Sequence, residues 1–300
     1  MMKKTLTVLM AAAAAASLAA CSSGKTASTT TAAAPSEAEE STAGAPSAAG
    51  STEAAGGSAE GSLSGVSLTF GTTALFAPFT YYDTDGKTLI GFDMDYMKAL
   101  KDYLGFSLNG DPQVMNYSAI TASLSANKLD MGMAALCATD ERKAVMNFSD
   151  TYYDTGQVVM INKETSPAEI SGTDALKDGK YTVGVEKGTA SHLYAQANYP
   201  AGCIKVYDTI TEAYLDLENG ANIQALLQDD ANAAYYIKTT DSTKLEIVGD
   251  IFNRGQSPYA IALSFSICDK YPEIVDDFNR GIAALKENGT YDTLYDRWLK

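Results

Sequence analysis

Strand-like and helix-like segments alternate along this chain from about residue 66 to its end. The helix-like segments carry apolar residues three and four apart, and the strand-like segments are short apolar runs. This alternation is typical of open α/β sheets, which bind ligands at the carboxyl ends of their strands. Strands are expected at 66–71, 129–134, 181–185, 203–207, 223–228, 245–248 and 259–263, and helices at 93–104, 117–127, from 189, 209–219, 229–238, 274–285 and 291–299.

The first 20 residues have the composition of a secretory signal. Lys3 and Lys4 precede an apolar run, Leu6 to Ala16, and small residues lead up to Cys21. A membrane span is the alternative, but spanning takes roughly 20 predominantly apolar residues, and this run is shorter and mostly alanine. We therefore expect residues 1–20 to be a cleaved signal peptide.

Residues 21–65 are dominated by Ser, Thr, Ala, Gly, Pro and Glu and contain no aromatic residue. Such a segment cannot bury enough apolar surface to offset the entropy lost on ordering. It is expected to be a disordered linker, either a tether that lets the folded part sample its surroundings or a plain spacer.

Charge and cysteine content exclude several classes of function. The formal net charge is -15 and no basic cluster occurs. This argues against nucleic-acid binding and against binding to anionic lipid through a basic segment. Apart from Cys21 there are three cysteines, so at least one is expected to be unpaired within the chain. The single histidine, His192, has no spaced partner, and we expect no metal site and no cofactor.

The stretch 129–162 joins a strand, a polar corner, an aromatic run and a second strand. At the corner, Thr139 or Asp140 can cap a short helix whose first turn carries Arg142. A guanidinium beside the N–H groups of a helix start suits a carboxylate. Surface pairing of Arg142 with Asp140 or Glu141 is the other interpretation of these residues.

This stretch resembles the signature region of the solute-binding proteins that serve ABC importers of polar amino acids, and the resemblance extends from about Val66 to Lys300. The ending Leu-Ala-Ala-Cys also resembles the bacterial lipobox, which implies lipidation of Cys21. The residues that match the signature are Thr139, Glu141, Arg142, Lys143, Phe148, Ser149, Tyr152, Tyr153, Gly156 and Gln157.

The resemblance implies a two-lobed, periplasmic-binding-protein-like α/β fold of type II, with two hinge crossings and a ligand cleft between the lobes. Lobe 1 is expected at 66–160 and 252–300, and lobe 2 at 161–251. The crossings are expected near 160–163 and 249–253. Hinge closure of the lobes around the ligand is a general property of such proteins.

The resemblance also assigns ligand contacts in lobe 1. Phe76 and Tyr117 correspond to aromatic residues that enclose the ligand side chain, and Arg142 to the residue that holds its carboxylate. The carbonyl of Ala135 and the N–H of Cys137 are expected to help, because Cys137 replaces the usual Thr or Ser and its thiol is a weak donor.

In lobe 2, the segment Gly188-Thr189-Ala190 resembles the family's glycine–threonine turn, which implies that the Thr189 hydroxyl and the Ala190 N–H complete the carboxylate site. Asp229 corresponds to the partner of the ligand ammonium. Asp230 is expected to cap the following helix, as Asp93 is expected to cap the helix after Gly91.

Together these features predict a monomeric, non-enzymatic protein that binds a free L-amino acid outside the cytoplasmic membrane and delivers it to an ABC permease. A polar uncharged ligand is favoured, because beyond Arg142 only Lys187 is a nearby cation and no second acid is evident. The alternatives are a dehydratase of the cyclohexadienyl type on the same fold, for which no placed acid can be identified, and an extracellular amino-acid sensor. No catalytic residue is predicted.

Overall fold

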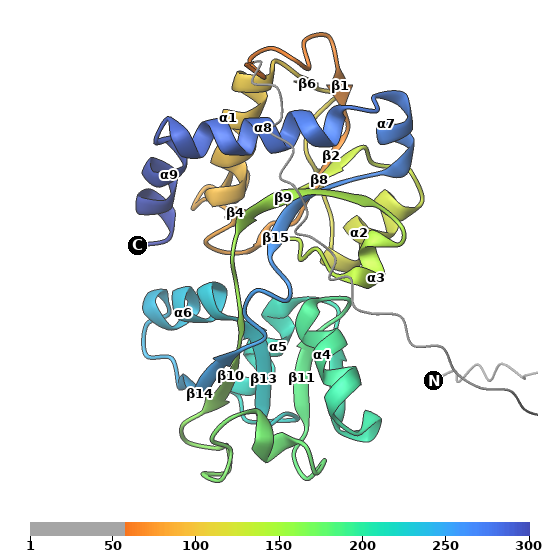
Figure 1. Ribbon diagram of the computed structural model, residues 1–300. Coiled ribbons are helices and arrows are strands. Elements are labelled where there is room, and N and C mark those ends of the chain that lie inside the picture. The colour runs from red at the N-terminus through yellow and green to blue at the C-terminus, as the bar shows by residue number, and fades with distance from the viewer. Residues whose placement is uncertain (1–57) are drawn as a thin grey trace, which may run out of the picture. The chain divides into compact units, whose positions relative to one another are not determined.

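The computed structural model describes residues 58–300, and it contains two lobes, each built on a five-stranded sheet (Figure 1). This mixed α/β architecture with two lobes confirms the predicted fold class. The chain begins in the first lobe, crosses to the second and returns. Residues 1–57, which include the expected signal peptide, Cys21 and most of the expected linker, lie outside the described part.

The first lobe has a sheet in the order β7-β2-β8-β15-β9 and two small sheets, β1-β6 and β3-β4-β5. Its elements are β1 (Ser67–Leu68), β2 (Phe70–Thr72), β3 (Leu75–Phe76), β4 (Thr80–Tyr82), β5 (Leu89–Ile90), α1 (Phe92–Leu104), β6 (Ser107–Leu108), β7 (Gln113–Val114), α2 (Tyr117–Ser125), β8 (Met131–Gly132), α3 (Asp140–Lys143), β9 (Asn147–Tyr153), β15 (Tyr259–Leu263), α7 (Phe265–Lys270), α8 (Ile274–Glu287) and α9 (Thr290–Trp298).

The second lobe has one sheet in the order β12-β11-β13-β10-β14. Its elements are β10 (Gln157–Asn162), η1 (Thr173–Leu176), β11 (Val183–Glu186), α4 (Ala190–Asn198), η2 (Ala201–Cys203), β12 (Ile204–Tyr207), α5 (Ile210–Glu218), β13 (Ala225–Asp229), α6 (Asp230–Thr239) and β14 (Leu245–Phe252).

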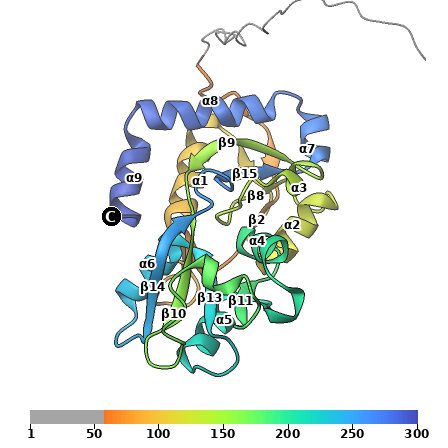
Figure 2. The same ribbon diagram turned by 60° about the horizontal axis from the view of Figure 1, so that its bottom comes forward.

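Helices cover both faces of each large sheet, as can be followed in Figures 1 and 2. In the first lobe, Ile120 and Leu124 of α2 are buried in one apolar cluster, whereas α1 and α8 contribute to another that includes Phe70 and Phe278. In the second lobe, side chains alternate along β11 and β13, so that one face packs against α4 and the other against α5 and α6. Two covered faces explain why every residue of β11, β13 and β15 is buried.

Three expected boundaries are wrong. Residues 58–65 belong to the first lobe: Ala59 and Leu63 are buried, and the N–H of Leu63 donates to the carbonyl of Leu104. The first crossing lies at 154–156, because β10 pairs over its length with strands of the second lobe. The second lies at 253–258, because β14 continues to Phe252.

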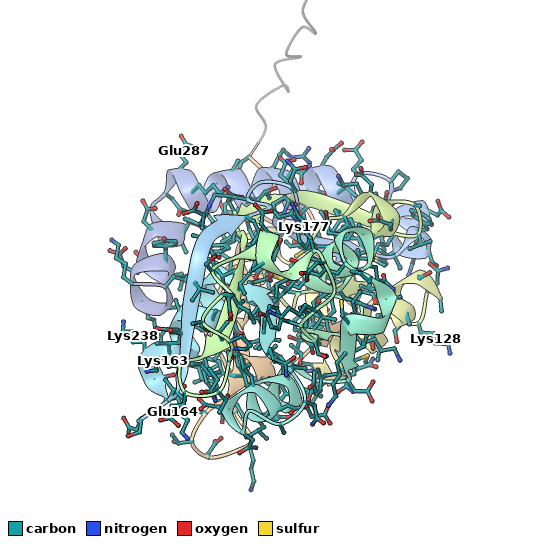
Figure 3. All side chains as sticks on the ribbon, turned by 90° about the horizontal axis from the view of Figure 1, so that it is seen from below. Lys128, Lys163, Glu164, Lys177, Lys238 and Glu287 are labelled. Carbon is teal, nitrogen blue, oxygen red and sulfur yellow. The ribbon has the colours of Figure 1, made fainter. Side chains whose placement is uncertain are left out.

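Charged side chains lie mainly at the surface. The labelled residues of Figure 3 are all exposed, and Lys128 lies on the opposite side of the view from Lys163 and Lys238. These lysines therefore do not form one basic face. Within the described part of the chain, every helix is too short or too polar to span a bilayer.

Candidate functional site

Arg142 lies in the short helix α3, at the corner where the sequence predicts it. The helix is capped by Thr139, whose hydroxyl accepts the N–H of Arg142. The Arg142 side chain is buried rather than paired on the surface, with 6% of its area exposed. Nη1 donates to the carbonyl of Cys137 and Nη2 to the carbonyl of Gly188 in the second lobe, each at 2.5 Å. Arg142 is therefore a buried cation that contacts both lobes.

Tyr117 begins α2 and supports this cation from within the first lobe. The guanidinium of Arg142 lies 5.0 Å from the centroid of the Tyr117 ring, a cation–π distance. The Tyr117 hydroxyl accepts the N–H of Cys137 at 3.4 Å. The ring therefore fixes one face of the guanidinium.

Ala135 and Cys137 lie in the buried loop after β8. Ala135 has a φ of 53°, which is unusual for a residue with a Cβ atom, and its N–H donates to Oδ2 of Asp93 at 2.7 Å. Asp93 also accepts a hydrogen bond from the Tyr152 hydroxyl at 2.9 Å. The expectation that Asp93 caps α1 is wrong, since Gly91 occupies the N-cap position and Asp93 holds the loop at Ala135 instead.

Burial raises the pKa of two side chains in this part of the lobe. The pKa of Asp93 is raised to about 6, although its two hydrogen bonds oppose the shift. Burial and the negative charge of Asp229 raise the pKa of the Cys137 thiol well above its usual range. Cys137 is thus a neutral thiol and offers its backbone N–H and carbonyl to its surroundings. None of the cysteines at 137, 203 and 268 is in a disulfide.

Thr189 and Ala190 form the start of α4, facing Arg142 across the lobes. Thr189 is the N-cap, and its hydroxyl both donates to the carbonyl of Glu186 and accepts the N–H of His192. Ala190, the first helical residue, is buried. The His192 side chain is half-buried, and its Nδ1 accepts the N–H of Gly188 at 3.0 Å. The structure thus brings the helix start and Arg142 together at Gly188.

Asp229 ends β13 and is buried. Its Oδ1 accepts from Nε2 of Gln157 at 3.0 Å, and its Oδ2 accepts from the hydroxyl of Tyr259 at 2.5 Å. Burial raises the pKa of Asp229 to about 6, opposed by these hydrogen bonds. Asp230 was expected to cap α6, but it is the first helical residue. Asp229 occupies the N-cap position, without a side-chain capping bond.

Phe76 is buried on β3, where its ring centroid lies 6.1 Å from that of Phe79. The structure places the other expected aromatic, Tyr117, against Arg142. No ring-to-ring contact joins Phe76 and Tyr117 within residues 58–300. The enclosure of a ligand side chain by these two residues therefore stays a prediction.

Three residues near the site carry no role in the sequence analysis. Gln157 lies in the matched signature and could have been singled out from it, whereas Tyr259 lies in an apolar strand that gives no such signal. Glu186 ends β11 and has 7% of its area exposed. Burial and the nearby Asp229 raise the pKa of Glu186 to about 8, against the effect of a hydrogen bond from the N–H of Ile210.

The geometry suits recognition of a zwitterion. A buried guanidinium and a helix start can hold a carboxylate, and a buried carboxylate can accept an ammonium. The positive charge of Arg142 and the carboxylate of Asp229 are near enough for Arg142 to oppose the rise that burial causes in the pKa of Asp229. In residues 58–300, no group of three or more His, Cys, Asp or Glu side chains is placed to hold a metal ion.

Comparison with known proteins agrees with this geometry. The family model of "Bacterial extracellular solute-binding proteins, family 3" matches residues 68–300. The arginine-binding extracellular protein ArtP of Bacillus subtilis (strain 168) is 28% identical over 243 residues, which cover 80% of this chain and 89% of ArtP. The L-cystine-binding protein TcyJ of Escherichia coli (strain K12) is also 28% identical, over 80% of this chain and 86% of TcyJ.

A solved structure described as an ancestral arginine-binding protein bound to glutamine superposes with a TM-score of 0.69 at 31% identity, covering 77% of this chain and 97% of the other. An ancestral amino-acid-binding protein described as a precursor of cyclohexadienyl dehydratase superposes with a TM-score of 0.66 at 29% identity, covering 78% and 94%. With its family model matched over residues 68–300, the chain belongs to the bacterial extracellular solute-binding proteins of family 3.

Proposed function

We propose that this protein captures a free α-amino acid outside the cytoplasmic membrane and delivers it to an ABC permease. The observation that carries the proposal is that contacts join buried Arg142 in the first lobe to buried Asp229 in the second. Arg142 donates to the carbonyl of Cys137, Cys137 forms a β-bridge with Tyr259, and the Tyr259 hydroxyl donates to Asp229. Such an arginine–aspartate pair complements the carboxylate and ammonium of an amino acid. Relatives named as binding arginine, cystine and glutamine support this class of ligand.

The proposed contacts follow from the positions of the groups. Arg142 and the start of α4 at Thr189 and Ala190 bind the carboxylate, with the backbone of Ala135 and Cys137 lining the same loop. Asp229 binds the ammonium, and Phe76 and Tyr117 contact the side chain. Arg142 donates to the carbonyl of Cys137 within the first lobe and to that of Gly188 in the second lobe, and a ligand carboxylate can replace these carbonyls as its partner.

The preference for an uncharged side chain, expected from the sequence, rested on two absences: no cation beyond Arg142 other than Lys187, and no second acid. Glu186 supplies a second buried acid near Asp229, so the argument against a cationic ligand no longer holds.

The test of this function is a thermal-shift and calorimetric screen of residues 58–300 against the common amino acids and cystine. A ligand at 100 times its Kd stabilises the native state by about 2.7 kcal/mol, so the cognate amino acid should raise the melting temperature. Its decarboxylated amine should not, because Arg142 then lacks its partner. Equal shifts from both compounds, or no shift from any amino acid, would overturn the proposal.

We further propose that Cys21, which lies outside the described residues, carries a lipid that anchors the protein to the membrane. The variant Cys21→Ser should leave the membrane fraction of the producing cell, because the linker's composition offers no apolar surface of its own. Continued sedimentation with membranes after a salt wash would contradict the anchor.

A further inference from the structure

Glu186 is a buried acid whose charge no described side chain balances. It has 7% of its area exposed, and no Lys or Arg in residues 58–300 forms a salt bridge with it. The adjacent Lys187 is exposed and pairs with Asp208 at 4.0 Å. A buried carboxylate of this kind is costly unless something compensates its charge.

The fold places Glu186 at the same sheet edge as Asp229. Strands β11 and β13 run parallel and pair through Val183 with Ala225 and Gly184 with Leu226. Glu186 and Asp229 are the last residues of these two strands. The carboxyl ends of parallel strands form the edge at which α/β sheets bind ligands.

This edge is also where the two lobes meet. Gly188, two residues after Glu186, accepts the hydrogen bond of Arg142 from the first lobe. Tyr214 lies close enough to both Glu186 and Asp229 for their charges to affect it. Its hydroxyl donates to Asn232, whose amide donates to the carbonyl of Ala77, the neighbour of Phe76. Hydrogen bonds thus connect Tyr214, a neighbour of Glu186, to the residue next to Phe76.

A capping role at α5 is the other explanation of Glu186, since the N–H of Ile210 donates to its carboxylate. However, α5 already has a complete capping box, in which Thr209 and Glu212 each accept the backbone N–H of the other. The capping box satisfies the N–H groups of Thr209 and Glu212 and leaves that of Ile210 for another acceptor. One backbone donor does not compensate the charge of a buried carboxylate, so capping accounts for only part of the surroundings of Glu186.

The number of charges decides between the ligand classes. Arg142 is the cation for the ligand carboxylate, and Asp229 is the anion for its ammonium. Glu186 then remains as one more buried acid than the zwitterionic group requires, and a cation bound beside it would favour its ionised form. We propose that Glu186 binds a positive charge on the ligand's side chain, so that the site selects an amino acid ending in an ammonium or guanidinium group. This inference rests on the proposed function.

The test compares Glu186→Gln with the unaltered protein in calorimetric titrations with L-arginine, L-lysine and L-glutamine. The unaltered protein should bind arginine or lysine at least about tenfold more tightly than glutamine, because loss of a buried charge pair has at least that effect. The variant should lose this preference, with weaker binding of the cationic ligand and little change for glutamine. Glu212→Gln is the matched control, because Glu212 is an exposed acid in the same region and glutamine preserves the capping box.

Each outcome bears on one of the two proposals. If the unaltered, folded protein binds no amino acid, the proposed function fails. If it binds amino acids but prefers glutamine over arginine and lysine, only the role of Glu186 fails. The role also fails if Glu186→Gln lowers the melting temperature but leaves the preference for cationic ligands intact, since that result marks a structural acid.

Discussion

The hydroxyl of Tyr259 donates a hydrogen bond to Oδ2 of Asp229 over 2.5 Å, although Tyr259 lies in β15 of the first lobe and Asp229 ends β13 of the second. The other oxygen of Asp229 accepts from Gln157 in β10, which is itself held by Asn253 at 2.8 Å. The proposed ammonium-binding carboxylate is therefore oriented by both lobes and by the second crossing, so its geometry depends on how the lobes are arranged.

Tyr259→Phe should weaken amino-acid binding roughly tenfold to a hundredfold. The change removes one hydrogen bond to a buried carboxylate, and such bonds contribute about 1.5–3 kcal/mol. Calorimetry gives the Kd directly. Tyr153→Phe is the control, because the Tyr153 ring lies 5.5 Å from that of Tyr259 yet its hydroxyl makes no hydrogen bond to Asp229. Similar losses in both variants would show that ring packing, not the hydroxyl, is responsible.

Asp229→Asn and Asp230→Asn separate the binding role from the structural role of adjacent acids. Removing the Asp229 charge should weaken binding by one to three decades, because the ligand ammonium is left without its buried partner. Asp230 instead accepts from Thr155 and pairs with Arg254 at 2.5 Å at a partly exposed place. Its replacement should cost about 1 kcal/mol of stability or less and leave the affinity nearly unchanged.

Calorimetry and chemical denaturation of both variants provide the two measurements. If Asp230→Asn abolishes binding while Asp229→Asn retains it, the assignment of the ammonium contact is off by one residue.

Arg142→Ala should reduce the affinity by one decade or more, since a carboxylate bound at this corner loses its guanidinium partner. Lys143→Ala is the matched control: the neighbouring cation is exposed, and its contact is a 3.3 Å pair with Asp140. It should change neither affinity nor stability by more than about 0.5 kcal/mol. Normal amino-acid binding by a folded Arg142→Ala protein would contradict the carboxylate assignment.

Local sequence patterns predicted the parts of the fold that depend on local interactions. Helix-capping residues predicted the short helix α3 (Asp140–Lys143) after Thr139, and apolar spacing predicted α8 from Ile274. The boundaries between lobes were wrong because neither the buried residues of β10 nor the mixed residues of β14 indicate which lobe they join, and only pairing between distant strands decides their membership. The same limit applies to residues 58–65, whose composition resembles the linker although Ala59 and Leu63 pack into the lobe.

For the candidate site, the family resemblance pointed to Arg142 and Asp229 but gave no role to Gln157 and Tyr259, which hydrogen-bond to Asp229. Asp93 looked like a cap because it follows Gly91 at a helix start, yet its carboxylate accepts the N–H of Ala135, 42 positions away. Glu186 gave no signal because an acid before a glycine–threonine turn is ordinary in an exposed loop. Its burial follows from the packing of α5 beside β11, which no local pattern specifies.

The last prediction concerns the pH dependence of stability and follows from the burial of Glu186. Its pKa is about 8 in the folded protein and near the ordinary 4.5 in the unfolded chain. Below pH 4.5 the carboxyl is protonated in both states, so its ionisation does not change the free energy of unfolding. As the pH rises to 8, the unfolded chain ionises first, so the free energy of unfolding falls relative to a protein without this acid, by at most about 5 kcal/mol. Above pH 8 the difference should level off.

The measurement is chemical denaturation of the ligand-free protein and of Glu186→Gln between pH 4 and pH 9. Asp229, Glu212 and Tyr214 also lie around Glu186, and Asp229 itself titrates near pH 6. Their contributions largely cancel in the difference between the two proteins, which should favour the variant increasingly from pH 5 to pH 8. A difference that stays constant over this range would mean that Glu186 is ionised in the folded protein throughout, with a compensating charge that the described residues do not supply.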